Sequence, residues 1–235
     1  MDWLASLKVT FILIIITIIF VCYRLLVHQV PTASLYDISD INLETGDVLL
    51  VSYNSLHATL VKVFAGSYWS HSAFVYRKHN RTYVIEMANY TNSKEQIPTK
   101  EEHKGLIMIP FEYWIIYNKK RYIGHLRCKS RKPSETKIQQ WFDKMKTIVK
   151  GTNMDVLYWM NTLLSRKYKY EDKEEYFCTE LVAKLLQDMN IIAKDYLPCC
   201  YSPNTLVALR NFEKVKIIKP SLYPFHNERN NSALS

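Results

Sequence analysis

The chain has 235 residues, 48% of them hydrophobic, with only 5 Gly and 8 Pro, a composition that excludes a disordered protein and is sufficient for one sizeable core. Its net charge of +9 fits either a solvated basic surface or attraction to anionic lipid headgroups. Lys and Arg are scattered along the chain and no aromatic–basic motif of a nucleic-acid module occurs, so we expect no nucleic-acid partner.

An apolar segment near the N-terminus predicts a membrane anchor. Residues 9–23 carry no charge, and with residues 25–27 the segment reaches the length of a bilayer core if Arg24 extends to the interface. The alternative is a cleaved signal peptide, but the apolar run is longer than a usual signal core and no clear small-residue cleavage site follows it. Lys8 precedes the segment and Arg24 follows it, so the charges around it do not determine the orientation of the predicted single-pass protein.

Two further patterns bear on the compartment. Glycosylation acceptor patterns at Asn80, Asn89 and Asn230 give slight support to a lumenal domain. The five cysteines form no spaced framework, and Cys199 and Cys200 are adjacent, which favours thiols that stay reduced. No Cys-x-x-Cys or His-Glu-x-x-His motif occurs, so we expect no metal, and the chain contains no cofactor motif that we recognise.

Periodicity and turn residues predict one α+β domain after a polar connection over 31–45. Strands are expected over 47–53, 71–77, 81–88, 106–109, 122–127 and 214–218. Helices are expected over 56–64, 112–117, 134–149, 155–164, 178–189 and 205–210. Residues 91–104 and the tail beyond Pro220 are polar and expected to be exposed.

A histidine and a cysteine occupy positions that suit a cysteine nucleophile. His71 begins one predicted strand, and Cys178 begins one predicted helix. The free amides and the positive dipole end of a helix start favour a thiolate over a thiol. A nearby imidazole can take the thiol proton, and the same amides can bind the oxyanion of a tetrahedral intermediate.

Glu86 is the candidate that would orient the histidine. A two-residue turn at 78–79 pairs Arg77 with Asn80 and places His71 opposite Glu86 on one sheet face. Moving the turn by one residue makes the pair diagonal, which two polar side chains can still bridge. A carboxylate in an apolar strand is also costly to bury without a partner.

Each of the three residues also has a structural interpretation. Cys178 fits a small core residue, His71 a half-exposed strand end, and Glu86 a solvent-facing strand position. Their combined placement favours catalysis, but the residues alone leave both interpretations open.

Spaced short motifs across residues 44–210 resemble those of the permuted NlpC-type, papain-like cysteine hydrolases of the YiiX/YaeF-like group, which are related in design to lecithin:retinol acyltransferase. The motifs are Gly46–Leu50, Trp69–Ala73, Val84–Glu86, Tyr176–Val182 and Tyr201–Leu206. The resemblance implies a circularly permuted papain-like α+β fold, an antiparallel sheet packed against helices, with Cys178 as nucleophile, His71 as base and Glu86 as the orienting residue. Thr179 stands where the family often has Ser, a departure that leaves these roles unchanged.

The predicted protein has an anchor at 1–30, a catalytic domain at 31–225 and a polar tail at 226–235. We predict a thiol hydrolase, amidase or acyltransferase that cleaves an amide, ester or thioester through an acyl-cysteine intermediate. Peptide-like and lipid acyl groups are the substrate classes that the resemblance implies, and the anchor favours a lipid or lipidated substrate. The alternatives are a non-catalytic binding or structural module on the same fold and, disfavoured by the cysteine pattern, a secreted disulfide-stabilised ligand binder.

Overall fold

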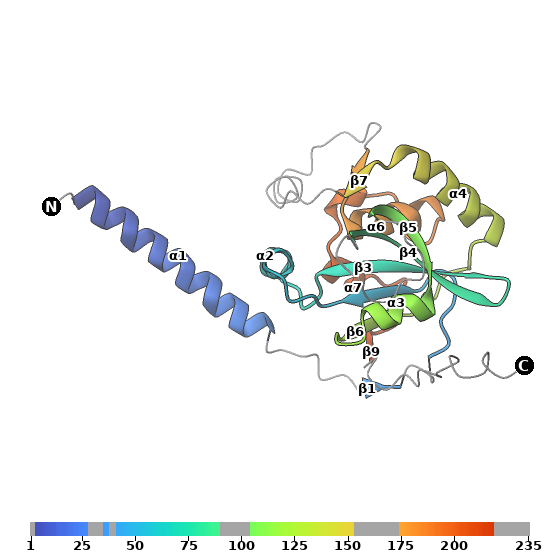
Figure 1. The fold of residues 1–235 in the computed structure, drawn as a ribbon, viewed down its shortest axis with the longest axis horizontal. Helices are drawn as coiled ribbons and strands as arrows, with labels where there is room; N and C mark the ends of the chain where they lie inside the picture. Colours follow the sequence, from blue (N-terminus) through green and yellow to red (C-terminus); the bar gives the residue numbers. More distant parts are fainter. Residues whose placement is uncertain (1–2, 28–34, 38–40, 90–103, 153–173, 219–235) are drawn as a thin grey trace, which may run out of the picture.

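The computed structural model describes residues 3–27, 35–37, 41–89, 104–152 and 174–218. Its centre is a seven-stranded sheet in which every neighbouring pair is antiparallel except the parallel pair β1–β9 (Figure 1). In spatial order the strands are β1 (Leu35–Tyr36), β9 (Lys216–Ile218), β6 (Ile123–Leu126), β2 (Val48–Val51), β3 (His71–Lys78), β4 (Arg81–Asn89) and β5 (Lys104–Pro110). A small parallel pair joins β7 (Gly151–Thr152) to β8 (Glu175–Tyr176).

Helices of the described residues are α1 (Trp3–Val27), α2 (Leu56–Ala65), α3 (Phe111–Tyr117), α4 (Glu135–Ile148), α6 (Cys178–Asp188) and α7 (Pro203–Ala208), with a short 3-10 turn η2 (Pro198–Cys200). Some of them cover the two faces of the sheet. One core cluster joins α4, α6 and α7 to one sheet face, and a second joins α3 to the opposite face. Because β2 lies between these layers, all four of its side chains are buried, as a continuous apolar run predicts.

The expected α+β class and antiparallel sheet are therefore present, with small differences at element ends. The strand β1 was not expected, since two residues give no periodic signal. Helix α7 begins two residues before its predicted start because the Ser202 hydroxyl accepts the Thr205 amide and Pro203 occupies the first turn. The helix expected over 155–164 lies outside the described residues.

The predicted register of the β3–β4 hairpin is wrong by one turn residue. Lys78 pairs with Arg81, so the turn consists of His79 and Asn80 rather than residues 78–79. Both turn residues have positive φ, 47° and 63°, as a tight hairpin turn of this kind requires. Asn tolerates this left-handed conformation better than most residues do, which favours Asn80 inside the turn.

The predicted anchor segment is helical. The described side chains of α1 span residues 9–23, and large apolar side chains over 9–21 are exposed. Within the described part of the chain, no helix combines the length and the apolar character needed to cross a membrane. The helix contacts α2, which lies between α1 and the sheet (Figure 1).

Candidate active site

The candidate site lies at one end of three neighbouring strands. Ile123 at the start of β6 pairs with Val51 at the end of β2, and Val51 pairs with His71 at the start of β3. The loops entering and leaving these strands therefore gather at the same sheet end. In Figure 1 this is the end of β3 nearest α2, opposite the β3–β4 hairpin.

His71 and Glu86 form a close buried pair at this end. His71 Nε2 hydrogen-bonds Glu86 Oε2 at 2.6 Å, and the Glu86 side chain is fully buried. The register pairs Phe74 with Ile85, so Glu86 faces Ala73 and reaches His71 diagonally. The direct opposition that a turn at 78–79 predicts is absent, and the diagonal arrangement that follows from moving the turn by one residue is the one observed.

The first turn of α6 brings Cys178 to the same place. Cys178 is the first residue of α6, and its half-buried thiol lies close enough to the His71 imidazole for the two groups to shift each other's pKa. The neighbouring Thr179 hydroxyl accepts a 3.1 Å bond from the Ser72 hydroxyl, which fixes the helix start against β3. The Glu180 carboxylate accepts the Phe177 amide at 3.1 Å and so caps the helix. The thiol, imidazole and carboxylate that the sequence singles out thus lie together.

The charges of the pair favour a thiolate and an imidazolium. Burial disfavours a charged His71, but the negative charges of Cys178 and Glu86 outweigh it and raise the pKa of His71 to about 10. Burial likewise opposes ionisation of Cys178, but the His71 charge and hydrogen bond and the Ser72 backbone lower the pKa of the thiol below its ordinary value. Since one ring nitrogen of His71 bonds Glu86, the other is the one that faces the thiol.

An aromatic ring that sequence reasoning missed covers the histidine. Tyr53 follows β2 and lies edge-on to His71, with ring centroids 5.4 Å apart. The Ser70 hydroxyl accepts the Tyr53 amide at 2.9 Å and donates to the Val51 carbonyl, which holds both loops together. Burial and the nearby Glu86 carboxylate raise the pKa of the Tyr53 hydroxyl well above its ordinary value, so it remains protonated. Nothing in the sequence marks Tyr53 beyond its position after a strand.

Close packing under the loop before His71 requires a glycine. A Cβ built on Gly124 of β6 would lie 2.8 Å from Trp69 Cζ2 and 2.9 Å from Val215 Cγ2. The Trp69 ring therefore packs directly on the β6 backbone, two residues before the histidine. This contact positions the chain that enters the site.

A second histidine–carboxylate pair lies at the opposite end of β2. His125 Nε2 bonds Asp47 Oδ2 at 2.7 Å, and both side chains are buried. The Asp47 carboxylate also accepts the Glu44 and Cys128 amides at 3.0 and 2.9 Å. These bonds tie the entrance of β2 to the end of β6, a structural role.

Among the described residues, no group of three or more His, Cys, Asp or Glu side chains is arranged to hold a metal ion. All five cysteines are free thiols. The site itself offers a thiol, an imidazole, a carboxylate and backbone amides.

The chain matches no protein-family profile and no curated protein. The solved structures with which it aligns include the metalloprotein yiiX from Escherichia coli O157:H7, at 15% sequence identity and a TM-score of 0.37. The alignment covers 77% of this chain and 92% of that protein. A similarity at this level carries no inference about the chemistry of this chain.

Proposed function

We propose that the protein is a cysteine hydrolase or acyltransferase in which Cys178 attacks an acyl carbon. The observation that carries the proposal is the contact of a helix-start thiol with a buried imidazole that is itself bonded to a buried carboxylate. This is the arrangement that activates a thiolate for covalent catalysis. The motif resemblance to the permuted NlpC-type, papain-like hydrolases, which covers roughly residues 44–210, supports the same three roles.

In the proposed reaction the Cys178 thiolate forms a C–S bond to the carbonyl carbon of an amide, ester or thioester. The carbonyl oxygen takes the negative charge, and backbone amides at the start of α6 are suited to stabilise it. The tetrahedral intermediate then expels the leaving group, which receives the proton of the His71 imidazolium. A water molecule, or an acceptor alcohol or amine in a transferase, gives a proton to His71 and attacks the thioester, which releases the thiolate.

We further propose that the substrate carries a lipid acyl group and that residues 1–30 anchor the protein to a membrane. The contact between α1 and α2 supports this, because α2 connects the end of β2 to the loop before His71. Leu56 at the start of α2 is 79% exposed, so an apolar side chain is available at this end of the molecule. A peptide-like substrate is the second candidate, which the motif resemblance also supports.

The test is capture of an acyl-enzyme. The full chain is incubated with octanoyl and N-acetyl-peptidyl thioesters, quenched in acid and analysed by peptide mass spectrometry. We expect the acyl mass on the peptide that contains Cys178, and loss of both the adduct and turnover in Cys178→Ala. Cys128→Ala is the matched control, since burial raises the pKa of that thiol, and it should retain both. Turnover that persists in Cys178→Ala would contradict the proposal. A reactive Cys178 that accepts no acyl group would instead support a non-catalytic binding module.

A further inference from the structure

Arg121 lies at the same sheet end as the candidate site and is held rigidly there. It comes two residues before Ile123, which is in register with Val51 and hence adjacent to the start of β3. Its Nη1 donates to the Tyr117 carbonyl at 3.1 Å and to Asn118 Oδ1 at 3.0 Å. Asn118 is fully buried and is itself fixed by a 3.0 Å bond from Nδ2 to the Trp114 carbonyl.

Tyr53 connects Arg121 to the imidazole. The guanidinium carbon of Arg121 lies 4.3 Å from the Tyr53 ring centroid and 5.3 Å from that of Tyr117. The same Tyr53 ring makes the edge-on contact with His71. A cation is therefore fixed one aromatic ring away from the imidazole of the site.

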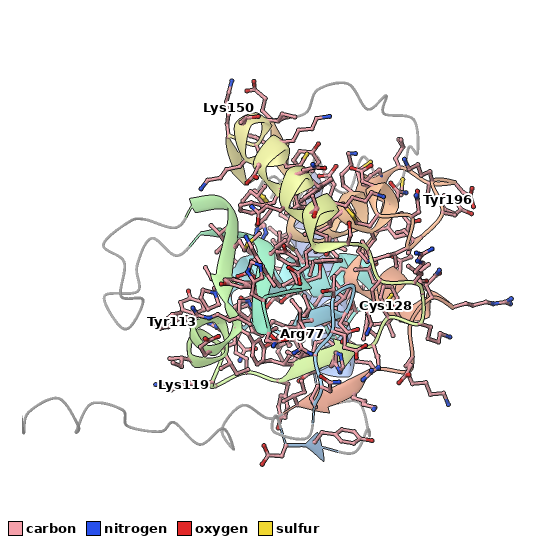
Figure 2. The ribbon with its side chains drawn as sticks, turned by 90° about the vertical axis from the view of Figure 1, so that its right-hand side faces the viewer. Arg77, Tyr113, Lys119, Cys128, Lys150 and Tyr196 are labelled. Atoms are coloured by element: carbon pink, nitrogen blue, oxygen red, sulfur yellow. The ribbon has the colours of Figure 1, made fainter. Side chains whose placement is uncertain are left out.

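Within the described residues, hydrogen bonds use only some of the donors of Arg121. A guanidinium has five N–H donors, and the two bonds to the end of α3 are made by Nη1. The Nε and Nη2 edge is the fork that matches a carboxylate or phosphate in bidentate geometry. Among the ion pairs of the described residues none involves Arg121, and the same holds for its exposed neighbours Lys119 and Lys120. Figure 2 shows Lys119 at the outer surface beside α3.

We infer that Arg121 binds an anionic group of the acyl substrate, a carboxylate or a phosphate, and thereby selects anionic over neutral substrates. The inference rests on the proposed hydrolase function and adds a specificity-determining residue to it. Capping of α3 accounts for Nη1 alone and leaves the Nε and Nη2 edge of the guanidinium unexplained. Anion binding uses that edge, and Lys119 and Lys120 add to the positive potential that attracts such a substrate.

The experiment compares matched anionic and neutral substrates. The first pair is the octanoyl thioester of 5-mercapto-2-nitrobenzoate, which carries a carboxylate, and that of 4-nitrothiophenol, which does not. The second pair is 1-octanoylglycerol 3-phosphate and 1-octanoylglycerol. For Arg121→Gln we expect kcat/KM to fall about 10- to 100-fold for the anionic member of at least one pair and less than about threefold for the neutral members. Arg121→Lys should restore part of the loss, because it keeps the charge and loses the fork.

Arg81→Gln is the matched control. Arg81 also lies over a tyrosine ring, Tyr83 at 5.8 Å, and also bonds α3, through Glu112 at 2.8 Å, but it stands next to the hairpin at the far end of β3. It should leave both substrate classes unaffected. The pair that responds identifies the anion as a carboxylate or a phosphate.

The results distinguish a failure of anion recognition by Arg121 from a failure of the hydrolase proposal. Equal losses on anionic and neutral substrates, or no loss on either, overturn anion recognition and leave the hydrolase proposal standing. Absence of Cys178-dependent turnover of all four octanoyl substrates by the wild-type chain overturns anion recognition, and the hydrolase proposal falls with it if the N-acetyl-peptidyl thioester is not turned over either. A thermal midpoint measured on each variant corrects every rate for the folded fraction.

Discussion

The two ends of β2 carry nearly the same constellation and differ in what it can do. At one end His71 bonds Glu86 at 2.6 Å beside Cys178, and at the other His125 bonds Asp47 at 2.7 Å near Cys128. The first pair lies beside its thiol and lowers the pKa of Cys178, whereas burial raises the pKa of Cys128. A buried histidine–carboxylate pair is therefore not by itself a catalytic site.

The second ring nitrogen of each histidine accounts for the difference. In His71, Nε2 bonds Glu86, so Nδ1 is the nitrogen left to interact with the neighbouring thiol at the start of α6. In His125, Nδ1 is buried, and within the described residues no group hydrogen-bonds it. The oxygens of the Asp47 carboxylate also accept hydrogen bonds from two backbone amides, which fixes β2 to its neighbours. One end of β2 thus has a histidine connected to a nucleophile, and the other has a histidine that only ties strands together.

Exchange of the two carboxylates for their amides gives the sharpest contrast. We expect Glu86→Gln to slow acylation of Cys178 about 100-fold, because the amide stabilises the His71 imidazolium less and orients its ring less strictly. Asp47→Asn should leave the rate per folded molecule within about threefold of wild type and lower the free energy of unfolding by about 2–4 kcal/mol. The measurements are single-turnover acylation and urea unfolding of each variant. If Asp47→Asn slowed acylation as much as Glu86→Gln at equal folded fraction, the distinction between the two ends would be wrong.

At the His71 end of β2, the sequence predicts which residues form the candidate site better than it predicts how they are arranged. His71 at a strand start and Cys178 at a helix start follow from local patterns, and the elements that carry them are present. The predicted hairpin turn, at residues 78–79, lies one residue before the observed turn at His79 and Asn80. The two residues of the turn are identified by their positive backbone φ values, which only the structure gives. Tyr53 meets His71 only because β2 and β3 pair in this register.

Contacts between distant segments had no sequence signal at all. Arg121 reaches the Tyr53 ring from the other side of β2, and the packing of Trp69 on Gly124 joins the loop before β3 to β6, which is not consecutive with β3 in the chain. His125 likewise gave no sign of its bond to Asp47, because a histidine within a short apolar strand looks the same whether it is paired or half-exposed.

The two thiols should also differ in the pH dependence of their alkylation. Because the pKa of Cys178 is lowered, its thiolate persists as the pH falls below 9, while the raised pKa of Cys128 delays its thiolate to higher pH. At pH 7 we expect iodoacetamide to modify Cys178 at least about 10-fold faster than Cys128, with the ratio shrinking above pH 9. The rate of acylation, which needs the imidazolium as acid, should fall as the pH rises through about 10, because His71 loses its proton there. Peptide-level alkylation rates over pH 5–10.5 test this, and equal rates at pH 7 would contradict it.

The smallest effect should come from Gly124, between the two ends. The Cβ added by Gly124→Ala would have to displace the ring of Trp69, a residue of the loop before His71. We therefore expect the free energy of unfolding to fall by about 1–3 kcal/mol. The displaced loop should also slow Cys178 acylation several-fold at equal folded fraction, while the Asp47–His125 bond stays in place because Gly124 does not take part in it. Gly105→Ala is the control: its φ of 92° strains an alanine, but no atom lies within 4 Å of the new Cβ, so it should lose stability without losing rate. If both variants slowed acylation alike, the effect would come from general destabilisation, and the Trp69 contact would have no special part in positioning His71.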